Sequence, residues 1–268
     1  MLGSLVMVLV VALSGTFTDV IDLDLSAQSY DRTLFRPNLK QSLGRWEVKH
    51  GSLQAIIPKG PVGRPPISFV GLFELEGDFE ISADYQLVAL PKPAATSAKN
   101  RGDVANTVEI VISGPAGWCV VSRKHLPMGE RISCFGELGG MRKFISELFP
   151  VSGSAGRLEA RREGEIIHFY RTEGGGPEVE IGSIPFGSGP VSEVSLQVYA
   201  MNTTDALDVR FSSLHVGAYA INRSLGGTSS RRPILTWALV LAGMVGGAFA
   251  VRRFAVRRRA APSPVPNT

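Results

Sequence analysis

The feature that most constrains the fold is a period-two alternation of apolar and polar residues through the middle of the chain. In the segment DFEISADYQLV, residues 78–88, the apolar positions are Phe79, Ile81, Ala83, Tyr85 and Leu87. Successive side chains of a β-strand point to opposite faces, so this pattern is typical of an antiparallel strand with one buried face. The segment is therefore predicted to be a half-buried strand.

Comparable runs recur along the chain, at residues 107–112, 118–121, 131–135, 166–171 and 194–200. Gly, Pro, Asn and Asp separate them, and Glu163-Gly164 is a turn between two strands of a hairpin. Many short strands predict an all-β sandwich or barrel. One stretch differs: Met141, Phe144, Ile145 and Leu148 follow helical spacing, which predicts a short helix.

The two ends of the chain predict targeting and anchoring. Residues 1–14 contain the apolar run Leu5–Leu13 followed by small residues, which is typical of a secretory signal peptide. Residues 234–251 form a stretch without charge that is long enough for one transmembrane helix. The sequence thus predicts a signal peptide at 1–14, a β-sandwich at 28–220, a linker at 221–233, a transmembrane helix at 234–251 and a cytoplasmic basic tail at 252–268.

The distribution of charge supports this topology. Of the 28 Lys and Arg residues, seven lie at or beyond Arg231; the 21 before it stand against 24 Asp and Glu, a net charge of −3. Five arginines follow residue 251, so the carboxyl end is expected in the cytoplasm and the β-domain outside it, on a single-pass protein of the cell membrane. The basic character belongs to the tail, and no nucleic-acid partner is expected.

A resemblance names the expected fold. The segment GRLEARREGEIIHFYRTEGGGPEVEIGSIPFGSGPVSEVSLQVYA, with the later ALDVRFSSLHV, resembles the closing half of concanavalin-like jelly-roll sandwiches of the laminin-G and lectin type. Upstream, GLFELEGDFEISADYQLV resembles a strand of bacterial extracytoplasmic domains of unknown function in that superfamily. The resemblance implies an all-β antiparallel jelly-roll β-sandwich. Lectins, glycosidases and adhesion modules share this fold, so it does not define a function.

One motif raises the question of catalysis. Glu76, Asp78 and Glu80 form an E-x-D-x-E pattern, which resembles the catalytic strand of the β-glucanase branch of the superfamily. A retaining glycosidase needs two carboxyl groups about 5 to 5.5 Å apart. Gly77, however, marks a turn at the start of the strand, and the motif has Glu74, Ser82 and Asp84 as neighbours where a catalytic cleft would have aromatic residues. A solvated acidic face is the alternative interpretation.

Other candidate positions concern binding and redox state. Trp118, Tyr170 and Tyr199 are candidates for stacking on sugar rings. Cys119 and Cys134 lie in two adjacent predicted strands, where either a disulfide or two buried thiols is consistent with the sequence. No metal-ligand spacing occurs, and calcium on a loop is left open as an option of such sandwiches.

These observations predict a membrane-anchored extracytoplasmic β-sandwich that binds a carbohydrate or a cell-envelope partner without catalysing a reaction. Two alternatives stay open. The first is a membrane-tethered glycoside hydrolase of the concanavalin-like superfamily. The second is a structural accessory subunit of a membrane assembly.

Overall fold

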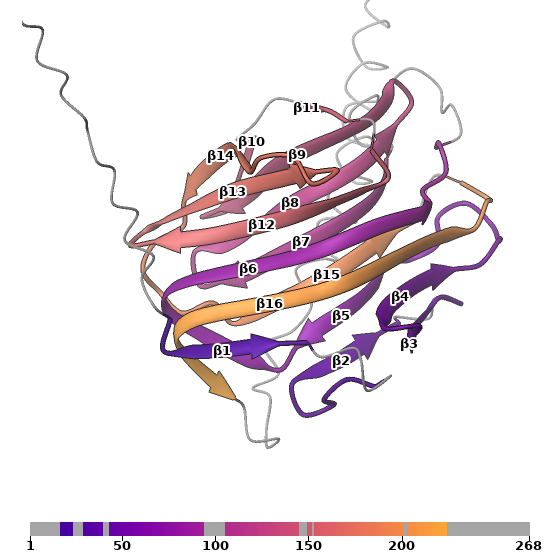
Figure 1. Cartoon of the computed structure of the whole chain (residues 1–268). Helices are drawn as coiled ribbons and strands as arrows, with labels where there is room; N and C mark the ends of the chain where they lie inside the picture. The colour runs from indigo at the N-terminus through magenta and orange to yellow at the C-terminus, as the bar shows by residue number, and fades with distance from the viewer. Residues whose placement is uncertain are drawn as a thin grey trace, which may run out of the picture. The chain divides into compact units, whose positions relative to one another are not determined.

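The computed structural model describes residues 17–23, 29–39, 43–93, 105–144, 149–151, 153–200 and 203–223. All regular secondary structure in these ranges is β-strand. The strands form two antiparallel sheets that lie one behind the other (Figure 1). The predicted all-β antiparallel sandwich is confirmed.

The first sheet, called sheet A, is the front layer in Figure 1 and has the strand order β14-β13-β12-β6-β16-β4-β3, with β1 also pairing with β16. Its strands are β1 (Asp19–Asp22), β3 (Arg45–Lys49), β4 (Ser52–Ile57), β6 (Phe73–Ala89), β12 (Ala155–Glu163), β13 (Ile166–Glu173), β14 (Val179–Pro185) and β16 (Leu207–Arg223). The long strands β6 and β16 pair along most of their length and form the centre of the sheet.

The second sheet, called sheet B, has the order β10-β9-β8-β7-β15-β5-β2, with β11 pairing with β9. Its strands are β2 (Phe35–Asn38), β5 (Ile67–Gly71), β7 (Asn106–Gly114), β8 (Gly117–Leu126), β9 (Gly129–Leu138), β10 (Met141–Phe144), β11 (Phe149–Pro150) and β15 (Glu193–Tyr199). Consecutive hairpins join β7, β8, β9 and β10, whereas β15 returns from sheet A to pair between β7 and β5.

The core lies between the sheets and follows from the alternation in the sequence. In β6, Phe79, Ile81 and Ala83 are buried, as are Phe169 of β13 and Phe211 of β16. The intervening side chains of these strands point to the outer face of sheet A, where Glu80, Asp84 and Gln86 are partly or fully exposed. Burial of one side of each strand thus leaves a separate outer face whose side chains are free for other interactions.

Turn residues set the strand register as predicted at the β12–β13 hairpin. Gly164 has φ of +60°, a backbone conformation that glycine adopts readily, and Glu163 pairs with Ile166 across the turn. The β3–β4 hairpin turns at His50-Gly51, where His50 also has a positive φ, of 53°. These two hairpins therefore place β13 and β4 on either side of the central strands.

The predicted short helix at residues 141–148 is wrong where the structure describes it. Met141–Phe144 form strand β10, which pairs back on β9 with Met141 opposite Leu138. Gly139 and Gly140, with φ of +57° and +77°, make the tight turn between the strands. The Gly-Gly turn directs the chain back along the edge of β9, where it pairs as a strand. In so short a segment, this pairing outweighs an apolar spacing that also fits a helix.

The predictions for the ends fall largely outside the described residues. These are the signal peptide at 1–14, the transmembrane helix at 234–251, the basic tail at 252–268 and most of the 221–233 linker. Strand β1 precedes residue 28, and β16 continues through Arg223. Within the part of the chain that the structure describes, no helix has the length and apolar character needed to cross a membrane.

Candidate functional site

The outer face of sheet A carries ordered rows of polar side chains, and we call it the polar face. Strand register places four residues side by side in each row across β13 or β12, β6, β16 and β4. The two rows nearest the β3–β4 turn are Thr172–Arg157–Asp84–Ser213 and Ala155–Gln86–Arg210–Gln54. The next rows are Tyr170–Glu159–Ser82–His215 and His168–Arg161–Glu80–Gly217.

An open groove of about 700 Å³ lies over the first two rows. Its floor includes Asp84, Gln86, Arg157 and Arg210, and its rim includes His50 from the β3–β4 turn. Tyr85 and Thr172 also line the groove, and the rest of the lining consists of small residues: Gly51, Ser52, Ala155, Gly156, Gly174, Gly175 and Ser212. Because these side chains are short, the groove exposes backbone groups together with a few long polar side chains, as ligand-binding sites commonly do.

Asp84 is fixed at the floor of the groove by two neighbours. Arg157 donates from Nε and Nη2 to the two carboxylate oxygens at 2.7 and 2.9 Å, and the Ser213 hydroxyl donates at 2.6 Å. The hydrogen bonds from Arg157 are the main cause that lowers the pKa of Asp84, and those to Asp84 raise the pKa of Arg157. A bidentate pair of this kind holds both side chains in a defined orientation.

Beyond the groove, Arg161 organises a second cluster on the polar face. Its guanidinium forms ion pairs with Glu80 at 3.4 Å, with Glu178 at 2.5 Å and with the buried Glu159. It also lies over the Tyr170 ring, 4.5 Å from the ring centroid. Burial is the main cause that raises the pKa of Glu159 to about 7. The charged side chains of this cluster thus pair with one another. The groove is the part of the polar face that is open to a ligand.

The E-x-D-x-E residues each have a structural partner. Glu76 accepts from the Asn222 amide at 2.7 Å, and Asp78 accepts from the Gly164 backbone N–H at 2.7 Å. Glu80 pairs with Arg161. The β6–β16 register shifts within the motif, where Gly77 has φ of +68°. The three carboxylates therefore lie outside the groove and stabilise a bulge, a hairpin turn and an ion-pair cluster.

Arg162 holds this bulge from the interior. Although the residue is 1% exposed, its guanidinium donates from Nε to the Gly77 carbonyl at 2.7 Å and from Nη1 to the Gly189 carbonyl at 2.5 Å. The guanidinium of Arg162 also lies over the Phe79 ring, 4.9 Å from the ring centroid. A buried arginine is tolerated here because two backbone carbonyls accept its hydrogen bonds.

The structure divides the three candidate aromatic residues between the two sheets. Tyr170 lies on the polar face, two residues before Thr172 of the groove. Trp118 and Tyr199 lie on sheet B: Trp118 packs edge-on against Phe135 with centroids 5.5 Å apart, and the Tyr199 hydroxyl donates to Gln197 at 2.7 Å. The three rings do not form one stacking platform, and Tyr170 alone of the three adjoins the groove.

Cys119 and Cys134 are both buried thiols, in the adjacent strands β8 and β9. Of the two alternatives left by the sequence, the structure contains the buried thiols. Burial is the main cause that raises the pKa of the Cys119 thiol well above its ordinary value, and the neighbouring Cys134 adds to it. Such thiols pack as small apolar groups and react slowly.

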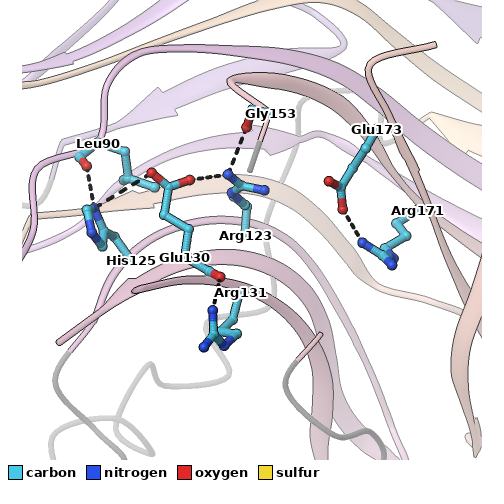
Figure 2. A network of polar contacts seen from close by, with 8 residues as sticks. All are labelled: Leu90, Arg123, His125, Glu130, Arg131, Gly153, Arg171 and Glu173. Atoms are coloured by element: carbon cyan, nitrogen blue, oxygen red, sulfur yellow. Dashed lines mark hydrogen bonds and ion pairs between the residues drawn. The ribbon is translucent and has the colours of Figure 1, made fainter. Parts of the chain in front are cut away.

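Beneath the groove, a partly buried polar network connects the ends of several strands (Figure 2). Arg123 of β8 is fully buried, forms an ion pair with Glu130 and donates to the Gly153 carbonyl at 2.8 Å. His125 contacts the Leu90 carbonyl at 2.7 Å and lies 4.0 Å from Glu130. The network therefore joins β8 and β9 of sheet B to segments that enter and leave β6 and β12 of sheet A.

Tyr85 connects this network to the groove. Its hydroxyl lies beneath Gly156, where an added Cβ would be 2.9 Å from that oxygen. Burial is the main cause that raises the pKa of Tyr85 to about 12, while the charge of Arg123 opposes the rise. The side chain of Tyr85 and the network around Arg123 therefore lie beneath β6 and β12, the strands that form the floor of the groove.

Sequence reasoning missed the residues that line the groove: His50, Asp84, Arg157 and Arg210. The signals available were a His-Gly pair at a hairpin turn and long polar side chains on the outer positions of the strands. No group of three or more His, Cys, Asp or Glu with metal-binding geometry occurs among the described residues.

Comparisons with solved structures agree with this architecture. The GH43 BlXynB protein from Bacillus licheniformis matches with a TM-score of 0.53 at 12% identity, over 74% of this chain and 39% of that protein. The legume lectin-like domain from Entamoeba histolytica matches with a TM-score of 0.51 at 11% identity, over 70% of this chain and 91% of that domain. The chain has a concanavalin-like β-sandwich fold.

A third match extends the same fold to a further module. The CBM2 module of the evolved Dit of Lactobacillus casei BL23 phage J-1 matches with a TM-score of 0.51 at 9% identity, over 75% of this chain and 95% of that module. No family model and no curated protein matches the sequence. This chain spans about two fifths of the length of BlXynB, and at these identities the concanavalin-like sandwich is a shared fold rather than a shared activity.

Proposed function

We propose that this protein is a non-catalytic, carbohydrate-binding module held outside the cytoplasm at the cell membrane. The observation that carries the proposal is the groove on the polar face, where Gln86 and Arg210 lie side by side among small residues and Arg157 lies in the adjacent row. A sugar presents a dense set of hydroxyl groups that both donate and accept hydrogen bonds. An amide, guanidinium groups and exposed backbone groups can satisfy them in a shallow site.

Tyr170 supports the same reading. It lies on the polar face next to the groove, and Arg161 packs against its ring and restrains its orientation. A restrained aromatic ring beside hydrogen-bonding groups provides an apolar surface for the C–H face of a sugar. The fold supports the proposal only in general terms, because proteins with a legume lectin-like domain or a CBM2 module share it.

The proposal excludes a catalytic role for the E-x-D-x-E strand. Glu76, Asp78 and Glu80 have structural partners, and none of them lines the groove. In the groove itself, Asp84 is paired with Arg157. A retaining or inverting mechanism needs a second carboxyl group at a defined distance, and Asp84 is the one carboxylate among the residues of the groove lining.

A glycan-array screen of the full chain in detergent micelles tests the proposal, with any bound glycan examined afterwards for hydrolysis products. Binding without product is the expected result, also for a Glu76→Gln, Glu80→Gln double variant. Product that disappears in the double variant would instead establish the glycoside hydrolase alternative. An array without signal would reject carbohydrate binding.

Membrane attachment through residues 234–251 is a separate part of the proposal, supported by their hydropathy and by the arginines that follow. The full chain is expected to remain in the membrane pellet after alkaline carbonate washing, and a chain that ends at Arg223 is expected in the supernatant. Release of the full chain by the wash would contradict the anchor.

A further inference from the structure

Arg210 distinguishes this groove from a site for neutral ligands. It lies on β16 between Gln86 and Gln54, and it lines the groove. Among the described residues, the Arg210 side chain has no hydrogen bond or ion pair, whereas Arg157 in the adjacent row is paired with Asp84. Apart from His50, the charged residues of the lining are Asp84, Arg157 and Arg210, which leaves one positive charge at Arg210.

The nearest acidic residue on the same strand does not neutralise this charge. Asp208 directs both carboxylate oxygens to the Gln54 amide, at 2.8 and 3.0 Å, and it forms no ion pair with Arg210 within 4.0 Å. A guanidinium presents a planar set of N–H donors that matches the two oxygens of a carboxylate or a sulfate. The unpaired Arg210 therefore offers the groove a site for an anionic group.

His50 adds a donor at the rim. It is the one residue other than glycine with a positive φ in the part of the chain that the structure describes, and it occupies the first turn position of the β3–β4 hairpin. Asn is the usual residue before Gly at such a turn, since it adopts this backbone conformation at low cost. The histidine thus places an imidazole beside the groove at a position where the turn itself favours another residue.

We propose that the groove selects saccharides that carry an anionic group, a uronic-acid carboxylate or a sulfate ester, and that Arg210 binds this group with His50 as a second contact. The inference rests on the proposed carbohydrate-binding function and names its ligand class. The sugar ring lies over Gln86, and the anionic group points toward β16 and the β3–β4 turn.

The test is an array with two matched pairs, tetragalacturonate beside its carboxyl-reduced form and a sulfated carrageenan tetrasaccharide beside its desulfated form, alongside neutral and acidic glycans of other types. The full chain is compared with Arg210→Gln, which removes the charge, and with His50→Asn, which keeps the turn. Arg36→Gln is the matched control, since Arg36 is an exposed arginine of β2 in sheet B. Thermal unfolding verifies that each variant is folded.

The wild-type protein is expected to bind acidic glycans at least about tenfold more tightly than their neutral counterparts, because a hydrogen bond to a charged group is stronger than one between neutral groups. Arg210→Gln is expected to remove this preference, His50→Asn to reduce it, and Arg36→Gln to leave it unchanged. The carboxylated and sulfated forms show which anionic group is preferred.

Three results would overturn the inference, and they separate it from the proposed function. Equal affinity of the wild type for acidic glycans and their neutral counterparts, unchanged in Arg210→Gln, would reject the anionic ligand and retain carbohydrate binding. Equal losses of affinity for acidic glycans in Arg210→Gln and Arg36→Gln would mean that any positive charge on the protein attracts these glycans. The groove would then make no specific contact with them. Absence of binding to every glycan would reject both proposals.

Discussion

Glu159 allows a quantitative test of the ion-pair cluster on the polar face. Its side chain is 2% exposed, between Tyr170 on one neighbouring strand and Ser82 on the other. Arg161 and Arg157 favour its ionised form, while Glu80 and Glu178 disfavour it. Burial outweighs the ion pair and raises the pKa of Glu159 from 4.5 to about 7. Replacing Glu159 by Gln removes the charge and retains the shape of the side chain.

The sign of the effect follows from linkage between protonation and folding. Because the pKa is higher in the folded protein, the folded state binds the proton more tightly, so the stability gained from protonation is complete below pH 4.5 and is lost as the pH rises through about 7. The difference corresponds to about 3 kcal/mol. Glu159→Gln is therefore expected to match the wild type at pH 4 and to be about 3 kcal/mol more stable at pH 8.

Urea unfolding of the full chain at pH 4 and pH 8 measures this difference, with Glu178→Gln as the matched control. Glu178 contacts the same guanidinium but is 38% exposed, so its replacement should change stability by less than about 1 kcal/mol at either pH. A Glu159→Gln variant that is destabilised equally at both pH values would refute the reasoning, since the ion pair would then outweigh the cost of burial.

Three further predictions concern packing and thiol state. Arg162→Met should destabilise the domain by about 3 kcal/mol in urea unfolding, because the Gly77 and Gly189 carbonyls lose their buried donor; an unchanged midpoint would contradict that role. Gly156→Ala should cost about 1–3 kcal/mol, because its Cβ would lie 2.5 Å from the Thr172 carbonyl, whereas Gly153→Ala, whose nearest contact is 3.5 Å away, should be nearly neutral. Without reductant, Cys119 and Cys134 should resist alkylation in the native protein and both react after denaturation, as mass spectrometry would show; resistance after denaturation would indicate a disulfide.

Many of the strands and the β12–β13 hairpin could be predicted from the sequence, because burial of one side of a sheet imposes a period of two on the residues. The β12–β13 hairpin is an example, with Gly164 at the turn and alternating residues on both sides. The prediction of a helix at 141–148 failed at Met141–Phe144 because sheet pairing after a Gly-Gly turn outweighed a short apolar pattern.

The candidate site was harder to predict because it depends on which strands become neighbours. Asp84 and Arg157 are 73 residues apart in sequence, and Arg210 joins them through the pairing of β16 with β6. Tyr170 was selected from its residue type, but its position beside the groove follows from the order β13-β12-β6-β16. Local patterns specify which face a side chain occupies, whereas the neighbours across strands are set by tertiary structure.

The most direct measurement of the central claim is the affinity of the full chain for the best array glycan, by isothermal titration calorimetry, in two variants that affect opposite sheets. Gln86→Trp places a large side chain on the groove floor, and Trp118→Ala removes one of the two aromatic candidates of sheet B. The account predicts that Gln86→Trp abolishes binding while Trp118→Ala retains it. Loss of binding in Trp118→Ala with full binding in Gln86→Trp would place the ligand on sheet B and contradict the account.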